Sequence, residues 1–205
     1  MQYFDNNSNL ISKKRQISVS LNERFYSFIS DNGVFSKSEV DYGSLALLKV
    51  LLKEELTGDI LDIGCGYGTI GLILAKNYPD NNFILSDVNM RACALARENS
   101  SLFGVNNVKV IESDLFENIN QSFSFIVTNP PIRAGKKVIY SIFEQSYQHL
   151  KQNGSLYLVI RRSHGAESAQ KFITSVFGNC ELLKKDKGFY IYRATKNDSK
   201  TKEDF

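Results

Sequence analysis

From Gly58 onward, short apolar runs alternate with longer segments of helical periodicity, and this alternation constrains the fold more than any other feature of the chain. Strands are expected at residues 59–63, 83–85, 108–111, 123–128 and 155–160, and helices at residues 70–77, 91–103, 138–150 and 166–177. Strands that alternate with helices form βαβ units, in which successive strands run parallel. The sequence therefore predicts an α/β fold with a largely parallel sheet.

The end of the chain breaks this alternation. Residues 181–184 and 189–193 flank a turn-rich link, which is typical of an antiparallel hairpin and brings the expected sheet to seven strands. Within the regular part, Asn153 and Gly154 are expected to form the turn between a helix and the fifth strand. The predicted sheet is thus mostly parallel and ends in a C-terminal antiparallel hairpin.

Length and composition indicate a single domain. The 205 residues with 42% hydrophobic content suffice for one well-buried core. We expect this domain at residues 31–195, an N-terminal extension packed on it at residues 1–30, and a disordered tail at residues 196–205. In the extension, residues 17–21 alternate cleanly and residues 24–28 loosely, which predicts one or two strands.

The composition also narrows the location and the chemistry. The longest apolar stretch, Leu45 to Leu52, is far shorter than the roughly 20 residues of a membrane span. The N-terminus lacks the apolar core of a secretory signal, so we expect a cytoplasmic protein. The three cysteines have neither paired spacing nor a nearby histidine, which argues against disulfides and against a metal site.

A glycine-rich segment follows the first expected strand directly. Asp62 precedes Gly64, Gly66 and Gly68, where the backbone can turn sharply and approach a ligand closely. A dinucleotide fingerprint would need a glycine at position 69, which is Thr69. The segment instead resembles the first motif of class I S-adenosylmethionine-dependent methyltransferases, in which the acid before the glycines reaches toward the methionine end of the cofactor. A purely structural turn is the alternative.

Acidic residues end the next two expected strands. Asp87 lies about 20 residues beyond the glycines, where a carboxylate can accept from both ribose hydroxyls, although it could instead cap the following helix. Asp114 matches the position that accepts from the adenine amino group in this fold. The carboxyl ends of parallel strands share one edge of a sheet, so these acids are expected to converge on one crevice with the glycines.

The tetrapeptide Asn129-Pro130-Pro131-Ile132 follows the fourth expected strand and resembles the motif of methyltransferases that act on planar nitrogen. The lone pair of an aryl amine is delocalised into the ring, so two acceptors must hold its hydrogens. The Asn129 side-chain oxygen and the Pro130 carbonyl would be these acceptors. The family commonly has an aromatic residue at the fourth position, so Ile132 leaves the stacking partner of the base open. A simple Pro-Pro turn is the structural alternative.

Basic residues are expected around the same edge of the sheet, and they fit the phosphates of RNA beside a flipped base. Ordinary solvated charges are the alternative interpretation. The residues are Arg133, Lys136 and Lys137, which follow the tetrapeptide, and Arg161 and Arg162, which follow the fifth strand.

Two segments carry a closer resemblance. Residues 33–44 and residues 129–136 resemble the small, single-domain branch of the 16S ribosomal RNA guanine-N2 methyltransferases, and the likeness runs from about Arg24 to Arg193. It implies a Rossmann-like class I sheet, S-adenosylmethionine as cofactor, and ribosomal RNA or the small ribosomal subunit as partner of a monomer or weak dimer. By position it implies this cofactor-binding set: Asp41, Gly43, Asp62, Gly64, Gly66, Gly68, Asp87, Val88, Asp114, Leu115 and Asn129.

Two other functions remain open. Protein glutamine N5-methyltransferases use a similar Asn-Pro-Pro-Tyr turn on a similar fold, but Ile132 and the basic residues count against that reaction. A catalytically inactive RNA-binding assembly protein could keep the fold without turnover. The intact acids and Asn129 count against this second function.

Overall fold

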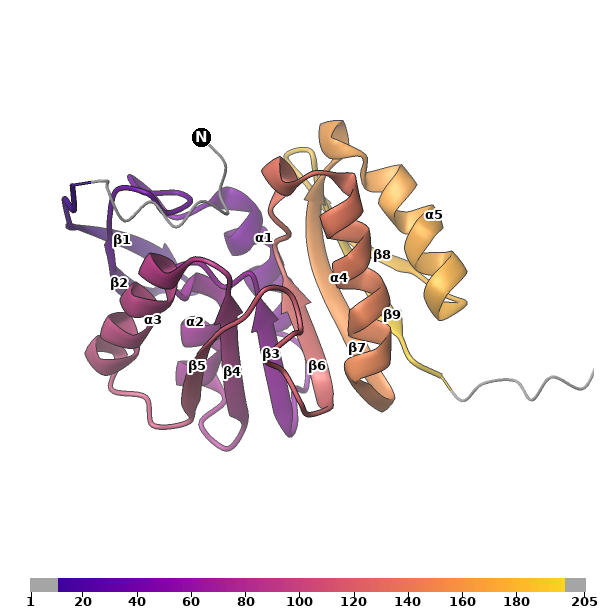
Figure 1. The fold of residues 1–205 in the computed structure, drawn as a ribbon, viewed down its shortest axis with the longest axis horizontal. Helices are drawn as coiled ribbons and strands as arrows, with labels where there is room; N and C mark the ends of the chain where they lie inside the picture. Colours follow the sequence, from indigo (N-terminus) through magenta and orange to yellow (C-terminus); the bar gives the residue numbers. More distant parts are fainter. Residues whose placement is uncertain (1–10, 198–205) are drawn as a thin grey trace, which may run out of the picture.

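The computed structural model describes residues 11–197, which form a seven-stranded sheet, a separate two-stranded sheet and five α-helices (Figure 1). The strands are β1 (Arg15–Leu21), β2 (Arg24–Ser30), β3 (Asp59–Ile63), β4 (Asn82–Asp87), β5 (Val108–Glu112), β6 (Phe123–Thr128), β7 (Leu150–Arg161), β8 (Glu181–Asp186) and β9 (Phe189–Thr195). The helices are α1 (Tyr42–Leu51), α2 (Thr69–Asn77), α3 (Met90–Phe103), α4 (Lys136–His149) and α5 (Ala166–Phe177), with single 3-10 turns at Ile132–Ala134 and Arg162–His164.

The large sheet has the strand order β5-β4-β3-β6-β7-β9-β8, with β9 antiparallel to both β7 and β8 and all other pairs parallel. This arrangement confirms the predicted fold class. The chain winds outward from β3 to β5, then returns to add β6 on the other side of β3. Open α/β sheets bind ligands at such a switch point, at the carboxyl ends of the strands. The connections that follow β3 and β6 therefore meet there.

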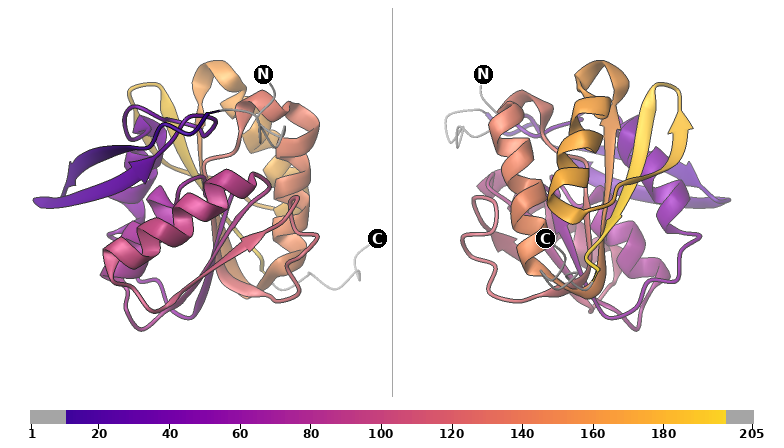
Figure 2. Two further views of the ribbon diagram at one scale, coloured as in Figure 1. Left: turned by 60° about the vertical axis from the view of Figure 1, so that its left-hand side comes forward. Right: turned by 90° about the vertical axis from the view of Figure 1, so that its right-hand side faces the viewer.

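Both faces of the sheet are buried, because successive strand residues point to opposite sides and both sides carry helices. In β3, Ile60 packs into the core beneath α1, α2 and α3, whereas Leu61 packs into the core beneath α4 and α5. The edge-on view in Figure 2 shows the sheet between these two helical layers. Continuous apolar runs such as β6 follow from burial on both faces.

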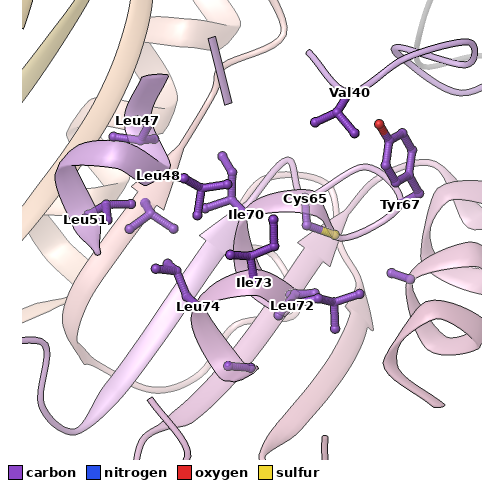
Figure 3. Close-up of a cluster of buried hydrophobic side chains, with 14 of the residues drawn as sticks. Val40, Leu47, Leu48, Leu51, Cys65, Tyr67, Ile70, Leu72, Ile73 and Leu74 are labelled. Atoms are coloured by element: carbon purple, nitrogen blue, oxygen red, sulfur yellow. The ribbon is translucent and has the colours of Figure 1, made fainter. Parts of the chain in front are cut away.

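Helix α1 was not expected from the sequence, yet it positions the edge of the site. Its N-cap is Asp41, and its leucines pack against α2, as Figure 3 shows. Leu47, Leu48 and Leu51 are fully buried in this cluster, together with Ile73. Burial of each such side chain contributes on the order of 2 kcal/mol, so the packing fixes the first turn of α1 beside the start of α2.

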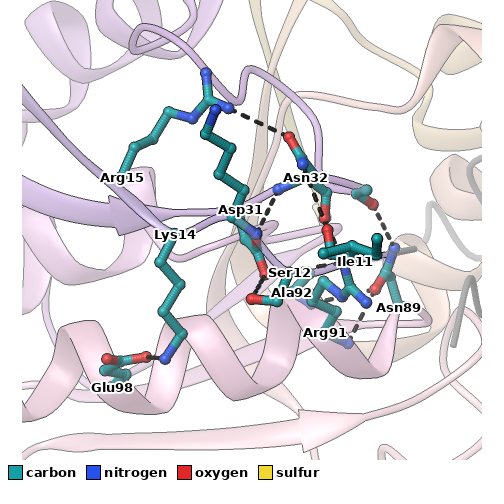
Figure 4. A network of polar contacts seen from close by, with 12 residues as sticks. Ile11, Ser12, Lys14, Arg15, Asp31, Asn32, Asn89, Arg91, Ala92 and Glu98 are labelled. Carbon is teal, nitrogen blue, oxygen red and sulfur yellow. Dashed lines mark hydrogen bonds and ion pairs between the residues drawn. The ribbon is translucent and has the colours of Figure 1, made fainter. Parts of the chain in front are cut away.

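The hairpin β1–β2 is tied to α3 and its tip projects from the body (Figures 1 and 2). Figure 4 shows the polar contacts at its base. The buried carboxylate of Asp31 accepts from Ser12 Oγ at 2.7 Å and lies 3.8 Å from the Arg91 guanidinium. Lys14 forms an ion pair with Glu98 of α3 at 2.6 Å. The hairpin therefore packs on the main domain, while residues 1–10 of the expected extension lie outside the described residues.

Two local expectations differ from the structure. The predicted turn at Asn153 and Gly154 is present, but it lies inside β7: Asn153 has a left-handed φ of +62°, and regular pairing with β6 begins at Ser155. The backbone of β7 remains bonded there, since Asn153 N–H donates to the Lys196 carbonyl and Lys196 N–H donates to the Gly154 carbonyl. Lys196, expected at the start of the tail, thus extends the pairing of β9, and residues 198–205 lie outside the described part of the chain.

Across residues 11–197 no helix combines the length and the apolar character that a membrane crossing requires. Within the same range, no three or more histidine, cysteine or acidic side chains are grouped as a metal would need. Cys65 and Cys93 are buried thiols, and Cys180 is partly buried.

Asn99 of α3 joins the hairpin to the segment that follows β3. Its amide oxygen accepts from Ile29 N–H at 2.7 Å, and its amide nitrogen donates to the carbonyls of Ile29 and Tyr67 at 3.0 and 2.9 Å. Because Asn99 is fully buried, Asn99→Ala leaves three backbone groups without partners, and we expect a loss of about 2–4 kcal/mol in the free energy of unfolding, measured by urea denaturation. Equal midpoints for Asn99→Ala and the exposed control Asn106→Ala would contradict this role.

Candidate active site

The segment between β3 and α2 is a tight loop held by backbone hydrogen bonds. The N–H groups of Gly64 and Cys65 donate to the Ser86 carbonyl of β4 at 2.8 and 3.0 Å. Gly68 has a φ of +99° and a Cβ there would lie 2.7 Å from a Leu72 methyl carbon, so only glycine fits. The loop therefore keeps its backbone at the carboxyl edge of the sheet, where it can meet a ligand.

Asp62 lies beneath this loop and is 1% exposed. Its Oδ2 accepts from the Gly71 N–H of α2 at 2.8 Å, whereas its buried Oδ1 has no hydrogen-bond partner in the described residues. Burial, together with the nearby Asp87 carboxylate, raises the pKa of Asp62 to about 7, although the Gly71 N–H acts in the opposite direction. Such an unpaired buried oxygen is costly unless a ligand or water satisfies it.

Asp87 holds the same loop from the end of β4. Its Oδ2 accepts from Gly66 N–H at 2.8 Å and its Oδ1 accepts from Asn89 N–H at 2.9 Å. The residue that caps α3 is Asn89, whose side chain accepts from two N–H groups of the first turn. The alternative interpretation of Asp87 as the helix cap is therefore wrong.

A small hollow of about 30 Å³ lies at the ends of β4 and β5. It brings together the predicted cofactor residues Gly64, Asp87, Val88, Asp114 and Leu115. Ile63, Ser86, Ser113, Pro131, Val138 and Ile142 complete its wall. Its lining combines carboxylates with apolar side chains, which suits a flat, mostly apolar group with hydrogen-bond donors at its edge.

A larger cavity of about 430 Å³ adjoins this hollow, because Gly64 and Pro131 line both. It joins the glycine loop to the Asn129–Ile132 tetrapeptide, which follows β6. The ends of β3 and β6 are held together by the buried Thr128 hydroxyl, which donates to the Ile63 carbonyl at 2.8 Å. The two motifs thus line one continuous site, as the sequence predicted.

The Asn129 side chain is held from outside its own loop. Its Nδ2 donates to Asp41 Oδ2 at 2.7 Å and to Ser44 Oγ at 3.0 Å, both at the start of α1. No residue of the described chain donates a hydrogen bond to its Oδ1. Asn129 therefore offers the cavity a hydrogen-bond acceptor whose direction is set by α1.

Several predicted site residues line neither cavity. Asp62 and Gly68 belong to the loop region but are absent from both cavity walls. Gly43 is also absent from them, and a Cβ at this position would lie 2.9 Å from the Phe189 ring. Among the predicted basic residues, Arg133 and Arg161 line the large cavity. The other three, Lys136, Lys137 and Arg162, are exposed and line neither cavity. The Lys136 ammonium lies 5.0 Å from the centre of the Tyr140 ring, and the Arg162 guanidinium lies 3.9 Å from the Glu167 carboxylate.

The structure adds residues that the sequence reasoning did not select. The large cavity is also lined by Phe35, Ser44, Tyr67, Thr69, His164 and Phe189. Phe189 comes from the C-terminal hairpin, because β9 runs antiparallel to β7 and so begins at the site edge. The same hairpin brings Lys185 and Lys187 to this edge, where they lie over the Tyr190 and Tyr42 rings. No local sequence signal connects the hairpin to the site.

Comparison with known proteins agrees with this geometry. A family model described as the methyltransferase small domain matches residues 25–193. The chain belongs to this family. YbxB of Bacillus subtilis (strain 168), described as an uncharacterized protein, is 45% identical over 196 residues, which cover 95% of this chain and 98% of YbxB.

Two further relatives are longer than this chain. Ribosomal RNA small subunit methyltransferase C of Vibrio parahaemolyticus is 33% identical over 190 residues, which cover 89% of this chain and 53% of that protein. The solved structure of the 16S rRNA N2 G1207 methyltransferase of T. Thermophilus, in complex with AdoMet and guanosine, has a TM-score of 0.82 and 25% identity. That match covers 92% of this chain and 52% of the other. The chain thus spans about half the length of these two relatives.

The raised pKa of Asp62 predicts a pH-dependent cost to stability. The native state keeps a proton on Asp62 that the unfolded chain releases, so the neutral carboxyl contributes stability below about pH 4, and this contribution is lost as pH rises through about 7. Asp62→Asn does not titrate. Without ligand, the free energy of unfolding of Asp62→Asn relative to that of the wild type should rise by about 2–4 kcal/mol from pH 5 to pH 8, measured by urea denaturation. Parallel pH profiles would contradict the shift.

Proposed function

We propose that this chain transfers a methyl group from S-adenosylmethionine to the exocyclic N2 amino group of a guanine in 16S ribosomal RNA. The observation that carries the proposal is the orientation of the Asn129 amide. Its NH₂ group donates to Asp41 and Ser44, and its oxygen can therefore accept a hydrogen bond from the amine that receives the methyl group. An acceptor oxygen beside a rigid Pro-Pro turn fits the hydrogens of a planar amine.

The residues at the strand ends fit S-adenosylmethionine. The small hollow offers carboxylates at Asp87 and Asp114 for the ribose hydroxyls and the adenine amino group, with Val88 and Leu115 as apolar walls. Asp87 Oδ2 and Oδ1 accept from the Gly66 and Asn89 N–H groups, which fixes this carboxylate at the wall of the hollow. The buried Asp62 Oδ1, which has no hydrogen-bond partner in the described residues, offers an acceptor toward the methionine end, and the cationic amino group of a bound methionine moiety would favour the ionised carboxylate.

The chain's own residues orient the acceptor amine. Asn129 Oδ1 and the Pro130 carbonyl accept its two hydrogens, which turns the nitrogen lone pair out of conjugation with the ring. Holding the amine in this direction lowers the entropy cost of reaction. When bound, S-adenosylmethionine would supply a sulfonium methyl group to the nitrogen lone pair, with S-adenosylhomocysteine as the leaving group. The amine then releases one proton to solvent.

The assignment of guanine in ribosomal RNA is supported by the relatives and by charge. Two relatives named for ribosomal RNA methylation match most of this chain, one as a sequence and one as a structure that holds guanosine. Arg133 and Arg161 line the cavity, and Lys187 of the hairpin lies at the same edge. Cations around an apolar cavity suit phosphates beside a base that has left its stack.

The direct test is transfer of tritiated methyl groups from S-adenosylmethionine to ribosomal RNA, small ribosomal subunits and total protein from cells that lack the gene. Nucleoside analysis should identify N2-methylguanosine in the RNA. Label in protein would favour glutamine N5-methylation instead. Binding of the cofactor without transfer to any fraction would favour an RNA-binding assembly protein.

We predict that Asn129→Ala lowers methyl transfer at least about 100-fold, because one of the two acceptors of the amine is lost. Its affinity for S-adenosylmethionine, measured by calorimetry, should stay within about threefold of the wild type. A large loss of cofactor affinity in Asn129→Ala would contradict the assignment and would make Asn129 a cofactor ligand.

We also predict that Arg133→Ala combined with Lys136→Ala weakens RNA binding and makes it less sensitive to salt. Removal of two phosphate contacts should lower the slope of log affinity against log salt by about 1.4 to 1.8. The matched control replaces Lys53 and Lys109, two exposed lysines that line neither cavity. If both double variants have the wild-type slope, the basic residues do not contact phosphates.

A further inference from the structure

Asp41 and Asn129 are 88 residues apart in sequence and meet at the large cavity. A single oxygen, Asp41 Oδ2, accepts from Asn129 Nδ2 at 2.7 Å and from the Ser44 backbone N–H at 2.9 Å. The second contact is the N-cap of α1. One carboxylate thus fixes the start of α1 and the side chain that follows β6.

The chemistry of this contact determines which way the Asn129 amide faces. An ionised carboxylate can only accept hydrogen bonds, so the group that faces Asp41 must be the NH₂ group of Asn129. The Ser44 hydroxyl accepts from the same NH₂ group at 3.0 Å. The amide oxygen is therefore turned away from α1. Without Asp41, the amide could rotate and present donors to an amine that needs an acceptor.

We propose that Asp41 is a positioning residue that holds the Asn129 amide oxygen toward the acceptor amine, and that it does not bind the cofactor. The proposal rests on the proposed transfer to an amino group. This role differs from the cofactor contact that the family resemblance implies for Asp41.

Gly43 supports the same interpretation. A Cβ at this position would lie 2.9 Å from Asp41 Oδ2 and 2.9 Å from the Phe189 ring. The absence of a side chain therefore leaves room for the carboxylate to reach Asn129 while the ring packs against α1. Gly43 lines neither cavity, so the structure gives it a steric role at this contact.

Three variants of Asp41 separate its two hydrogen bonds. Asp41→Asn can place its amide oxygen where Oδ2 lies and keep both contacts. Asp41→Ser keeps a good N-cap but is too short to reach Asn129. Asp41→Ala loses both contacts. We expect Asp41→Ser to lower kcat at least tenfold with thermal stability and cofactor Kd close to wild type, whereas Asp41→Asn should stay within about threefold in kcat.

A second measurement does not depend on any substrate. In the wild type, the Asn129 side-chain NH₂ protons should be protected from exchange, as seen by ¹⁵N NMR with Asn129→Ala for assignment. This protection should be lost in Asp41→Ser and kept in Asp41→Asn. Unchanged protection in Asp41→Ser would overturn the contact, even if the wild-type protein methylated no guanine.

The kinetic outcomes are equally distinct. If Asp41→Ser weakens cofactor binding about as much as it lowers kcat, Asp41 is a cofactor ligand and the proposal is overturned. If Asp41→Ser has wild-type kcat on an amine that the wild type methylates, the amide needs no positioning and the proposal also fails. Absence of transfer by the wild type would instead count against the proposed function, and the NMR result would still decide the contact.

Discussion

Parallel pairing of β3 with β6 is the contact on which the rest of the site depends. The register aligns Asp62 with Val127, so both strands end at the same edge of the sheet. The buried hydrogen bond from Thr128 to the Ile63 carbonyl ties these ends together. Because the two faces of each strand pack into different cores, a one-residue shift of register would move every side chain into the wrong core and is strongly disfavoured. The glycine loop and the Asn129 turn are thereby brought to one place with little freedom to separate.

The candidate site contains buried polar atoms that have no hydrogen-bond partner within the described residues. Asp62 Oδ1 and the Ser86 hydroxyl are buried without partners in the described residues, while the neighbouring backbone groups of the loop are bonded. Unpaired buried oxygens are unfavourable in the free protein and become favourable when a ligand donates to them.

Structural and chemical roles coincide at the start of α1. Asp41 ends an irregular segment, caps the helix and binds Asn129, and the leucines of the same helix anchor it in the core. The apolar packing therefore determines where the carboxylate lies, and the carboxylate determines how the amide is turned. A buried hydrophobic contact between α1 and α2 is in this way linked to the direction of one hydrogen-bond acceptor in the cavity.

The sequence by itself determined the order of the strands and helices after Gly58, the glycine loop and the Asn-Pro-Pro turn, because these are local patterns of burial and backbone freedom. It missed α1, and it did not show that the turn at Asn153 stays paired with the end of β9 and so lies within β7.

Only the tertiary structure decided which side chains share the cavity. Ser44 and Phe189 reach Asn129 and the cavity through contacts between residues far apart in the chain, and the residue types alone carry no signal of them. Sheet order and helix packing bring such residues together because burial of apolar surface on both faces of the sheet permits only one arrangement of the elements. Local propensity specifies the elements, whereas this long-range burial specifies the site.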